Sequence, residues 1–567
     1  MVANNLASVG NENANIVERY LMSVDTASLS QKPAPDFDVI VVGAGFAGVY
    51  LLHRLRSDGY RVRVIEAGDN VGGVWYWNTY PGARCDVESL QYSYSFDENL
   101  DREWKWSERY ATQPEIQSYI EFVADRFDLK RDIVFNTKVE GAAFAPEQDL
   151  WTVRTDDAQT LTARWVVMAT GALSSSKMPE IDGLNDFAGT TFHTGHWPRD
   201  GVDLTGKTVA VIGTGSSGIQ AIPEIAKQAA QLFVFQRTPH FSVPAQNGPI
   251  AQEWREEWDR DRQALRAKIL STRSGVLYDY GQTSALSASQ DERQREYEER
   301  WATGGTNFLY AYNDILRDED ANATAADFVR GKIREIVKDP AVADRLTPTG
   351  YPIGAKRICV DTDFYATFNR SNVTLVSVLD TPIERINATG IKTSGGQYDV
   401  DVLVFATGYD ALTGSLTRID IRGADGRSLK EAWSAGPYTN LGLMTANFPN
   451  MFMITGPGSP SVLSNMVVSI EHDANWIGDT LNHLRKIGAT RIETTEAAQQ
   501  TWMDHVRELA EATLYYKGNS WYLGANVPGK PRVFMPYLGG VDVYQAKCAE
   551  VAQNGYPGFI IGDGDNA

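Results

Sequence analysis

Two glycine-rich loops are the residues of this sequence whose spacing points most directly to chemistry. In the first, "VVGAGFAG", Gly43, Gly45 and Gly48 lie between an apolar run and a stretch of helical period. Such a loop turns tightly, brings bare backbone close to a diphosphate and directs that diphosphate at a helix N-terminus. Glu66 follows Gly43 by 23 residues, where a carboxylate can accept hydrogen bonds from ribose hydroxyls. We therefore expect a βαβ dinucleotide-binding unit here.

A second loop, "VIGTGSSG", repeats the spacing with Gly213, Gly215 and Gly218. Counting 23 residues from Gly213 reaches Gln236 instead of an acid, and Arg237 follows it. A carboxylate would repel the 2′-phosphate of NADP, whereas a guanidinium accepts it. One charge-assisted hydrogen bond from Arg237 to the 2′-phosphate would favour the binding of NADPH over that of NADH by about ten- to a hundredfold. The pair of loops predicts FAD in the first unit and NADPH in the second, the alternative for Arg237 being a solvated surface cation.

The elements that position these loops define an α/β fold with two Rossmann-like domains. The apolar runs at 165–171 and 402–408 both end in "ATG" and are expected strands where the chain leaves and re-enters the first domain. A charged stretch of helical period at about 243–352 predicts solvated helices inserted in the NADP domain. The expected parts are an N-terminal extension at 1–36, an FAD domain at 37–172 and 410–567, and an NADP domain at 173–409 with its helical insert at about 243–352.

Composition narrows the class of protein. The chain has 567 residues, 43% of them hydrophobic and 22% charged, which is typical of a globular protein of more than one domain. Its net charge of −19 argues against nucleic acid or an anionic membrane as a partner. No apolar signal segment or 18-residue apolar span occurs, so a cytoplasmic location is expected. The three cysteines are far apart, which disfavours a dithiol centre or a disulfide framework.

Between the two loops lies "FAGTTFHTGHWP", which we interpret as a linker immediately before the strand of the second loop, with two histidines three residues apart. No third ligand is present in the segment, so a metal site is not expected. The segment fits the pattern FxGxxxHxxxW through Phe187, Gly189, His193 and Trp197. In this it resembles the fingerprint of type I Baeyer–Villiger monooxygenases. The resemblance implies that His193 is a structural strut bound to neighbouring backbone, whereas His196 is unmatched and is interpreted as an ordinary polar side chain.

The resemblance extends from about residue 36 to 559 and is strongest to the branch of phenylacetone and steroid monooxygenases. It includes "WYWNTYPGARCDVES", "GAKRICVDT", "GPGSPSVLSNM" and "NSWYLGANVPGKPRVFM". The family often has arginine where Thr79 stands, so we assign Thr79 no role. The implied reaction uses NADPH and O₂ to insert one oxygen atom beside a ketone carbonyl. It passes through a peroxyflavin and a tetrahedral adduct and yields an ester or lactone.

Several site residues follow from the resemblance alone. Arg357 is the implied active-site cation, and Asp86 is the acid that orients it. Lys356 is an implied second contact to the 2′-phosphate beside Arg237, and Trp521 lies on a loop expected to fold over bound NADP. The expected FAD-binding residues are Gly43, Gly45, Gly48, Glu66, Gly73, Val74, Trp75, Trp77, Asp86, Tyr92 and Met466; those for NADP are Gly213, Thr214, Gly215, Ser216, Ser217, Gly218, Arg237, Thr238, Lys356, Arg357 and Trp521.

The expected partners are a ketone and O₂, without nucleic acid or membrane, in a monomer or small homo-oligomer. The alternative function is a flavin-containing N- or S-oxygenating monooxygenase, which shares both dinucleotide units. Its fingerprint ends in tyrosine or phenylalanine, whereas Trp197 ends this one. A disulfide reductase requires a close cysteine pair that the sequence lacks. A non-enzymatic redox sensor is the remaining reading, and the Arg357, Asp86 and Trp521 matches disfavour it.

Overall fold

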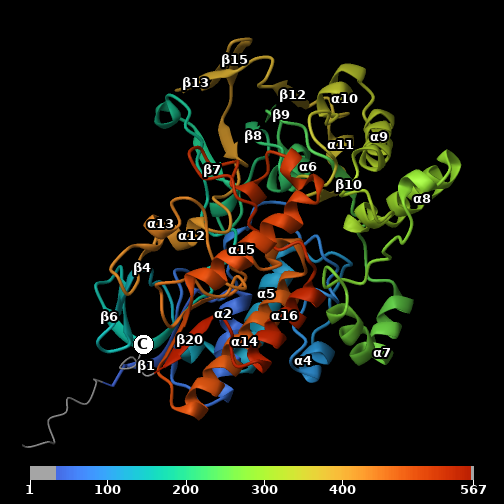
Figure 1. The fold of residues 1–567 in the computed structure, drawn as a ribbon. Coiled ribbons are helices and arrows are strands. Elements are labelled where there is room, and N and C mark those ends of the chain that lie inside the picture. The colour runs from blue at the N-terminus through green and yellow to red at the C-terminus, as the bar shows by residue number, and fades with distance from the viewer. Residues whose placement is uncertain (1–33, 563–567) are drawn as a thin grey trace, which may run out of the picture. The chain divides into compact units, whose positions relative to one another are not determined.

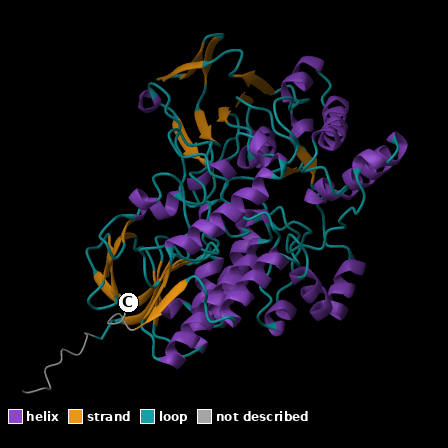
Figure 2. Ribbon diagram, viewed as in Figure 1, coloured by secondary structure: helices purple, strands orange, loops and turns teal. Residues whose placement is uncertain are grey.

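The computed structural model describes residues 34–562, and residues 37–562 belong to one compact unit (Figure 1). Most of the expected N-terminal extension, residues 1–33, lies outside the described residues. No helix within the described range is both long and apolar enough to cross a membrane. Figure 2 shows an architecture of both helices and strands. The element order shows that the two types alternate along much of the chain.

An eight-stranded sheet carries the first glycine loop. Its spatial order is β17-β4-β5-β6-β1-β2-β3, with β18 paired to β6. Central β1 is a buried, β-branched run and pairs in parallel with both β2 and β6, as a Rossmann unit requires. The strands are β1 (Phe37–Val42), β2 (Val62–Ile65), β3 (Ile133–Val134), β4 (Val139–Ala145), β5 (Leu150–Thr155), β6 (Thr160–Met168), β17 (Asp420–Arg422) and β18 (Met451–Met453).

A five-stranded, all-parallel sheet carries the second loop, in the order β12-β9-β8-β16-β7. Its edge strand β7 is the first half of the fingerprint segment, with His193 paired to Phe405. The interpretation of this segment as a linker is therefore wrong for its first half, because four residues complete the sheet. The strands are β7 (Thr190–His193), β8 (Thr208–Ile212), β9 (Gln231–Gln236), β12 (Val373–Ser377) and β16 (Val402–Phe405).

Helices and small sheets complete the unit. Helix α2 (Phe46–Ser57) follows the first loop and α6 (Ser216–Gln228) follows the second. Three short sheets are formed by β10 (Ser242–Pro244) with β11 (Cys359–Asp361), by β13 (Ile383–Asn387), β14 (Gly390–Thr393) and β15 (Gly396–Asp399), and by β19 (Arg491–Thr494) with β20 (Phe559–Gly562). The other helices outside the insert are α3 (Val74–Trp77), α4 (Glu98–Glu103), α5 (Gln113–Arg126), α11 (Phe364–Thr367), α12 (Gly414–Thr417), α13 (Leu429–Ala432), α14 (Met466–Ile487), α15 (Glu496–Glu511) and α16 (Val541–Gln553).

The expected helical insert is present as α7 (Gln252–Leu270), α8 (Gln290–Thr303), α9 (Glu319–Ile336) and α10 (Pro340–Leu346). Its helices are not solvated on every charged face, which corrects the prediction. In α7, Trp258 is 1% exposed and Arg266 lies over its ring. The side chains of Arg262 and Arg266 both reach Asp101 of α4, at 3.3 and 3.1 Å. The charge pattern predicted the helix correctly but could not reveal its partner on another helix.

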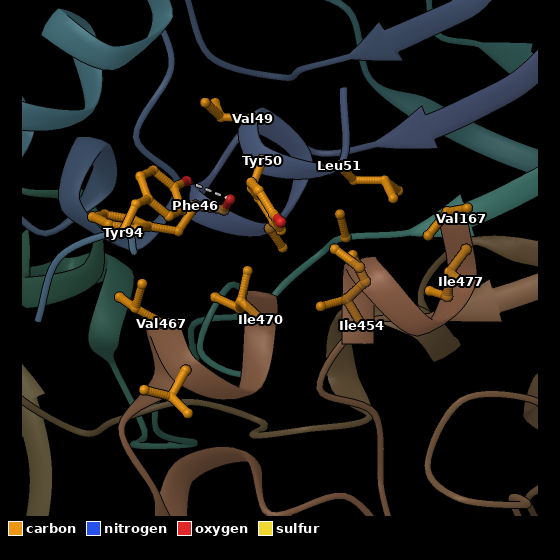
Figure 3. Close-up of a cluster of buried hydrophobic side chains, with 14 of the residues drawn as sticks. Phe46, Val49, Tyr50, Leu51, Tyr94, Val167, Ile454, Val467, Ile470 and Ile477 are labelled. Carbon is orange, nitrogen blue, oxygen red and sulfur yellow. Dashed lines mark hydrogen bonds between the residues drawn. The ribbon is translucent and has the colours of Figure 1, made fainter. Parts of the chain in front are cut away.

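A buried cluster holds α2 in place and with it the first glycine loop (Figure 3). Phe46 and Tyr50 of α2 belong to the same buried cluster as Ile470 and Ile477 of α14. The hydroxyl of Tyr94 donates to the carbonyl of Phe46 at 2.6 Å, within the first turn of the helix. Fully burying one such aromatic or aliphatic side chain stabilises the fold by about 1.5–3 kcal/mol. The N-terminus of α2 is therefore held rigidly by residues more than 400 positions away.

Candidate active site

The first glycine loop has the geometry of a diphosphate cradle. Gly43 has φ +103°, and a Cβ there would lie 2.6 Å from the carbonyl oxygen of Ala169. A Cβ on Gly48 would lie 1.9 Å from the carbonyl oxygen of Gly43, so helix and strand approach as closely as backbone permits. Gly45 precedes α2 and no side chain caps that helix. The first amides of α2 are thus free for an anion, which fits the diphosphate of FAD.

Glu66 has a role in this structure that the sequence did not reveal. Its two carboxylate oxygens accept hydrogen bonds from the backbone amides of Ala44, at 2.6 Å, and Gly68, at 2.8 Å. The side chain is only 5% exposed, and burial raises the pKa of this carboxyl while the amide bonds oppose that rise. Glu66 therefore fixes the shape of the loop itself, and its remaining lone pairs are the ones available to ribose hydroxyls.

A second glycine segment touches the first. Gly73 has φ +57°, and a Cβ there would lie 2.8 Å from the Cα of Gly45. Beside it the indole nitrogen of Trp75 donates to the hydroxyl of Tyr92 at 3.1 Å, and both side chains are buried. This hydrogen bond brings together two residues that are predicted to line the flavin. The bare backbone at Gly73 beside them would let a planar ring approach closely.

The other residues expected at the flavin are less uniform. Val74 is exposed, and the ring of Trp77 packs edge-on against His196 of the fingerprint at 6.1 Å. Met466 begins α14 and is half-buried against two hydrophobic clusters. Trp77 thus contacts the fingerprint segment, a contact for which the sequence contains no signal.

The second glycine loop repeats the cradle. Gly213 has φ +115°, and a Cβ there would lie 2.4 Å from the carbonyl oxygen of Ala406. A Cβ on Gly218 would lie 2.3 Å from the carbonyl oxygen of Gly213. Around Gly215 there is open space, and α6 begins there with no side-chain cap. This loop also fits a diphosphate at a helix N-terminus.

The hydroxyl groups near this loop have mixed positions. Thr214 is buried, and its hydroxyl lies 3.4 Å from the carbonyl of Thr238. Ser216 is exposed at the start of α6, with its Oγ 3.3 Å from the Sγ of Cys359, and Ser217 beside it is half-buried. The exposed Ser216 and the half-buried Ser217 are accessible from the open side of the loop, whereas Thr214 supports it from within.

Three cations gather at the edge of the sheet that carries the second loop. Arg237 follows β9 and is exposed, while Gln236 turns inward and donates to the carbonyl of Arg345 at 2.8 Å. Burial, and then the charge of Arg237, lower the pKa of Lys356. The same two causes lower the pKa of Lys177. Like charges kept this close favour a polyanionic ligand such as a 2′-phosphate.

Lys177 is the residue of this group that the sequence reasoning missed. It lies in an irregular segment six residues after the "ATG" that ends the first expected strand, and no motif marks it. Its backbone amide donates to the carbonyl of Gly408 at 3.0 Å, and its Nζ donates to the carbonyl of Asn526 at 2.6 Å. Only the tertiary structure brings residue 177 next to residue 237.

A bidentate ion pair joins residues 271 positions apart. The Nε and Nη2 atoms of Arg357 donate to the two carboxylate oxygens of Asp86 at 2.7 and 2.9 Å. The Nη1 atom donates to the carbonyl of Val462. Burial alone would lower the pKa of Arg357, but Asp86 and the hydroxyl of Tyr522 raise it well above its usual value. The guanidinium is therefore permanently charged and held in one orientation.

Tyr522 is a second residue that sequence reasoning missed. Burial raises its pKa to about 12, opposed by Arg357, so it is a neutral hydroxyl beside the guanidinium. Its neighbour Trp521 is half-buried with its ring 4.3 Å from that of Tyr522. The segment that carries both is held just after β16, where Asn526 donates to the carbonyl of Tyr409 at 2.7 Å and Lys530 binds Asp410.

The fingerprint segment supports the site without entering it. The Nδ1 atom of His193 accepts from the amide of Gly195 at 2.9 Å, and burial lowers the pKa of His193 to about 4, so the ring is neutral. The prediction of a strut bound to backbone is confirmed. His196, expected to be an ordinary polar side chain, has its Nε2 2.8 Å from the hydroxyl of Ser176. Thr79, given no role above, donates to the carbonyl of Trp197 at 2.9 Å.

Two dinucleotide cradles and one fixed cation define the class: a flavin- and NADP-dependent oxidoreductase. The family described as pyridine nucleotide-disulphide oxidoreductase matches residues 37–261. The three cysteines are buried and unpaired, so the likeness concerns the nucleotide-binding framework. A Baeyer–Villiger monooxygenase of Pseudooceanicola batsensis is 41% identical, over 93% of this chain and 96% of its own. This chain belongs to the type I Baeyer–Villiger monooxygenases.

Other relatives extend the comparison. A phenazine N-monooxygenase of Lysobacter antibioticus is 42% identical over 93% of this chain and 97% of its own. The structure of an oxidised steroid monooxygenase bound to NADP is 52% identical, with a TM-score of 0.89 over 93% of this chain and 99% of its own. A closed cyclohexanone monooxygenase is 42% identical, with a TM-score of 0.91 over 93% and 99% of the two chains.

Proposed function

We propose that this enzyme uses FAD, NADPH and O₂ to insert one oxygen atom beside the carbonyl of a ketone, giving an ester or lactone. The observation that carries the proposal is the Arg357–Asp86 pair, a permanent cation with no acidic proton to deliver. When bound, FAD supplies the activated oxygen. The relatives named as ketone monooxygenases act on cyclohexanone, cyclopentanone and acetone. A ketone is therefore the substrate class that we infer.

In this proposal the chain's own residues position and neutralise charge. Arg357 stabilises negative charge that develops on oxygen, and Asp86 holds the guanidinium in register. Two Arg357 nitrogens are used by Asp86 and one by Val462, so the face towards Tyr522 is where a reacting oxygen would meet the remaining donors. A preorganised donor of this kind contributes about 10²–10³ in rate.

For the cofactors, we propose that the loop at Gly43–Gly48 and Glu66 bind FAD, and that the loop at Gly213–Gly218 with Arg237 and Lys356 binds NADPH. Trp75 and Tyr92 lie at the flavin, and Trp521 covers the nicotinamide side. The proposed domains are residues 37–172 with 410–567 for FAD and residues 173–409 for NADP. The eight-stranded and five-stranded sheets support this division, because every strand of the second sheet lies between 190 and 405.

The test is turnover of a ketone panel by the purified enzyme, with NADPH consumption and product mass measured together. We expect ketone-dependent NADPH oxidation with esters or lactones as products. Arg357→Ala should bind FAD and be reduced by NADPH, yet lose ester formation by at least about a hundredfold. Arg357→Lys is the matched control that keeps a cation but not the bidentate contact with Asp86. Unchanged ester formation in Arg357→Ala would refute the assignment.

A second function receives support from one observation. A relative that is 42% identical is named a phenazine N-monooxygenase, a name that describes oxygen transfer to nitrogen. A phenazine and a tertiary amine belong in the same substrate panel. N-oxide formation without ester formation from any ketone would favour this alternative.

A further inference from the structure

A cavity of about 290 Å³ lies between the helical insert and the C-terminal part of the chain. Its wall is aromatic and aliphatic over much of its area, with Tyr310 and Leu309 from the insert and Leu463, Tyr515 and Tyr537 from the C-terminal part. Apolar walls with a few directed polar groups are typical of small-molecule sites. The cavity is therefore suited to the carbon skeleton of an organic substrate.

Two residues of the cavity wall, Leu463 and Tyr515, lie next to residues that contact the Arg357 guanidinium. Val462, whose carbonyl accepts from Arg357, is followed directly by Leu463, which lines the cavity. Tyr515 also lines it, and its ring is 5.7 Å from that of Tyr522, the hydroxyl beside Arg357. A ketone with its carbonyl at Arg357 would extend into this space.

The cavity wall is positively charged, whereas the protein as a whole is negatively charged. Its only charged residues are Arg273 and Arg317, in a chain of net charge −19. The Arg273 guanidinium is oriented by its Nη2 bond to the carbonyl of Leu538 at 2.7 Å. The Arg317 guanidinium has no hydrogen bond or ion pair within residues 34–562. Ser274, Gln282 and Asn313 add further polar groups to the same wall.

Acids lie beside the cavity but not in its wall. A Cβ on Gly540, which lines the cavity, would meet Asp542 on one side and Arg273 on the other. Asp318, Glu319 and Asp320 line an adjoining hollow that shares Arg317. The only charged groups in the wall are therefore cationic, and a hydrocarbon tail would use neither the Arg317 guanidinium nor the Arg273 donors that Leu538 leaves free.

We propose that this cavity is a subsite for an oxygen acceptor at the end of the ketone remote from its reacting carbonyl. This inference rests on the proposed function and names its substrate class: ketones with a distal carboxylate, ester or similar oxygen. Arg317 is the primary donor, because its guanidinium is unoccupied, and Arg273 is the second. A ketone whose distal oxygen accepts a hydrogen bond from a guanidinium should have a kcat/KM about tenfold or more above that of the ketone with the same skeleton and a hydrocarbon tail.

The experiment compares four ketones of one skeleton: 4-phenylbutan-2-one and its para-carboxylate, para-methyl ester and para-aminomethyl derivatives. We expect kcat/KM for ester formation to be about tenfold higher or more for the carboxylate and the methyl ester than for the parent. The aminomethyl compound, an ammonium ion, should be the poorest substrate. A gain for the carboxylate alone would narrow the acceptor to an anion; no gain for either would overturn the proposal.

Variants separate the subsite from the reaction. Arg317→Met should abolish the preference and leave turnover of the parent ketone unchanged, while Arg317→Lys should retain part of it. Arg334→Met, an exposed arginine of α9 outside the cavity, is the matched control and should keep the full preference. A preference that survives Arg317→Met and Arg273→Met overturns the subsite. Failure of every ketone to give an ester would instead refute the proposed function.

Discussion

At the scale of single residues, the site depends on charges that are close in space and distant in sequence. Arg357 and Asp86 form a bidentate pair whose side chains are 27 and 25% exposed, so each charge directly faces its counter-charge. At the second site, by contrast, burial and then the charge of Arg237 lower the pKa values of Lys356 and Lys177. The first arrangement suits a group that must keep its charge, and the second suits a site that awaits an anion.

Lys177 provides a prediction at this scale. If it contacts the 2′-phosphate, Lys177→Met should lower kcat/KM for NADPH by about tenfold and leave that for NADH unchanged. Steady-state kinetics with both coenzymes measures this. Lys207→Met is the matched control, since Lys207 is exposed just before β8, at the opposite end of the same sheet. Equal losses with both coenzymes would show that Lys177 acts only by holding the loop at Asn526.

At the scale of elements, α7 of the insert is joined to α4 by a buried charge cluster. The side chains of Asp101, Arg262 and Arg266 are 6, 8 and 12% exposed, and the carboxylate lies between the two guanidinium groups. Removal of one partner from a buried ion pair is far more costly than loss of a surface pair. One aspartate therefore makes two of the buried contacts that hold α7 against α4.

Asp101→Asn should lower the free energy of unfolding by about 3–5 kcal/mol, because it removes the acid that Arg266 pairs with and leaves Arg262 with Asp259 alone. Urea unfolding measures the change in the free energy of unfolding. Faster hydrogen exchange in residues 252–270 would show that the destabilisation is in α7. Asp344→Asn removes a surface pair with Arg334, whose side chains are 70 and 52% exposed, and should cost less than about 1 kcal/mol. Equal effects of the two substitutions would contradict the assignment.

At the scale of the whole molecule, burial of ionisable groups links stability to pH. His472 in α14 packs edge-on against Tyr544, and its Nε2 atom is buried without a hydrogen-bond partner. Burial lowers the pKa of His472 from 6.5 to about 4. The unfolded chain therefore binds a proton between pH 6.5 and 4 that the folded chain refuses. The contribution is complete above pH 6.5 and is lost as the pH falls to 4.

His472→Phe removes this titration and keeps a ring of similar shape against Tyr544. The unfolding free energy of the wild type minus that of the variant should fall by about 1.4 kcal/mol per pH unit between pH 6.5 and 4. Denaturant unfolding of both proteins across that range measures it. The difference should be constant above pH 7, and a difference that is also constant below pH 6 would refute the assignment.

Much of the framework could be predicted because its signals are local. In each loop the first glycine has a positive φ and the third lies against the carbonyl of the first, both features of one βαβ unit, so the glycine spacing alone identified both cradles. The charged insert was recognised as helical for the same reason. The reading of the fingerprint as a linker failed because a strand of four residues has no pattern of its own, and its pairing with β16 lies 200 residues away.

Sequence by itself therefore determined the two dinucleotide loops, the acid after one and the arginine after the other, and the family. Tertiary structure decided which side chains meet: Arg357 with Tyr522, Lys177 with Arg237, and Arg273 with Arg317 in one cavity wall. The physical reason is that spacing along a helix or strand is set by backbone geometry. Proximity between distant segments depends instead on how whole elements pack, which no short motif encodes.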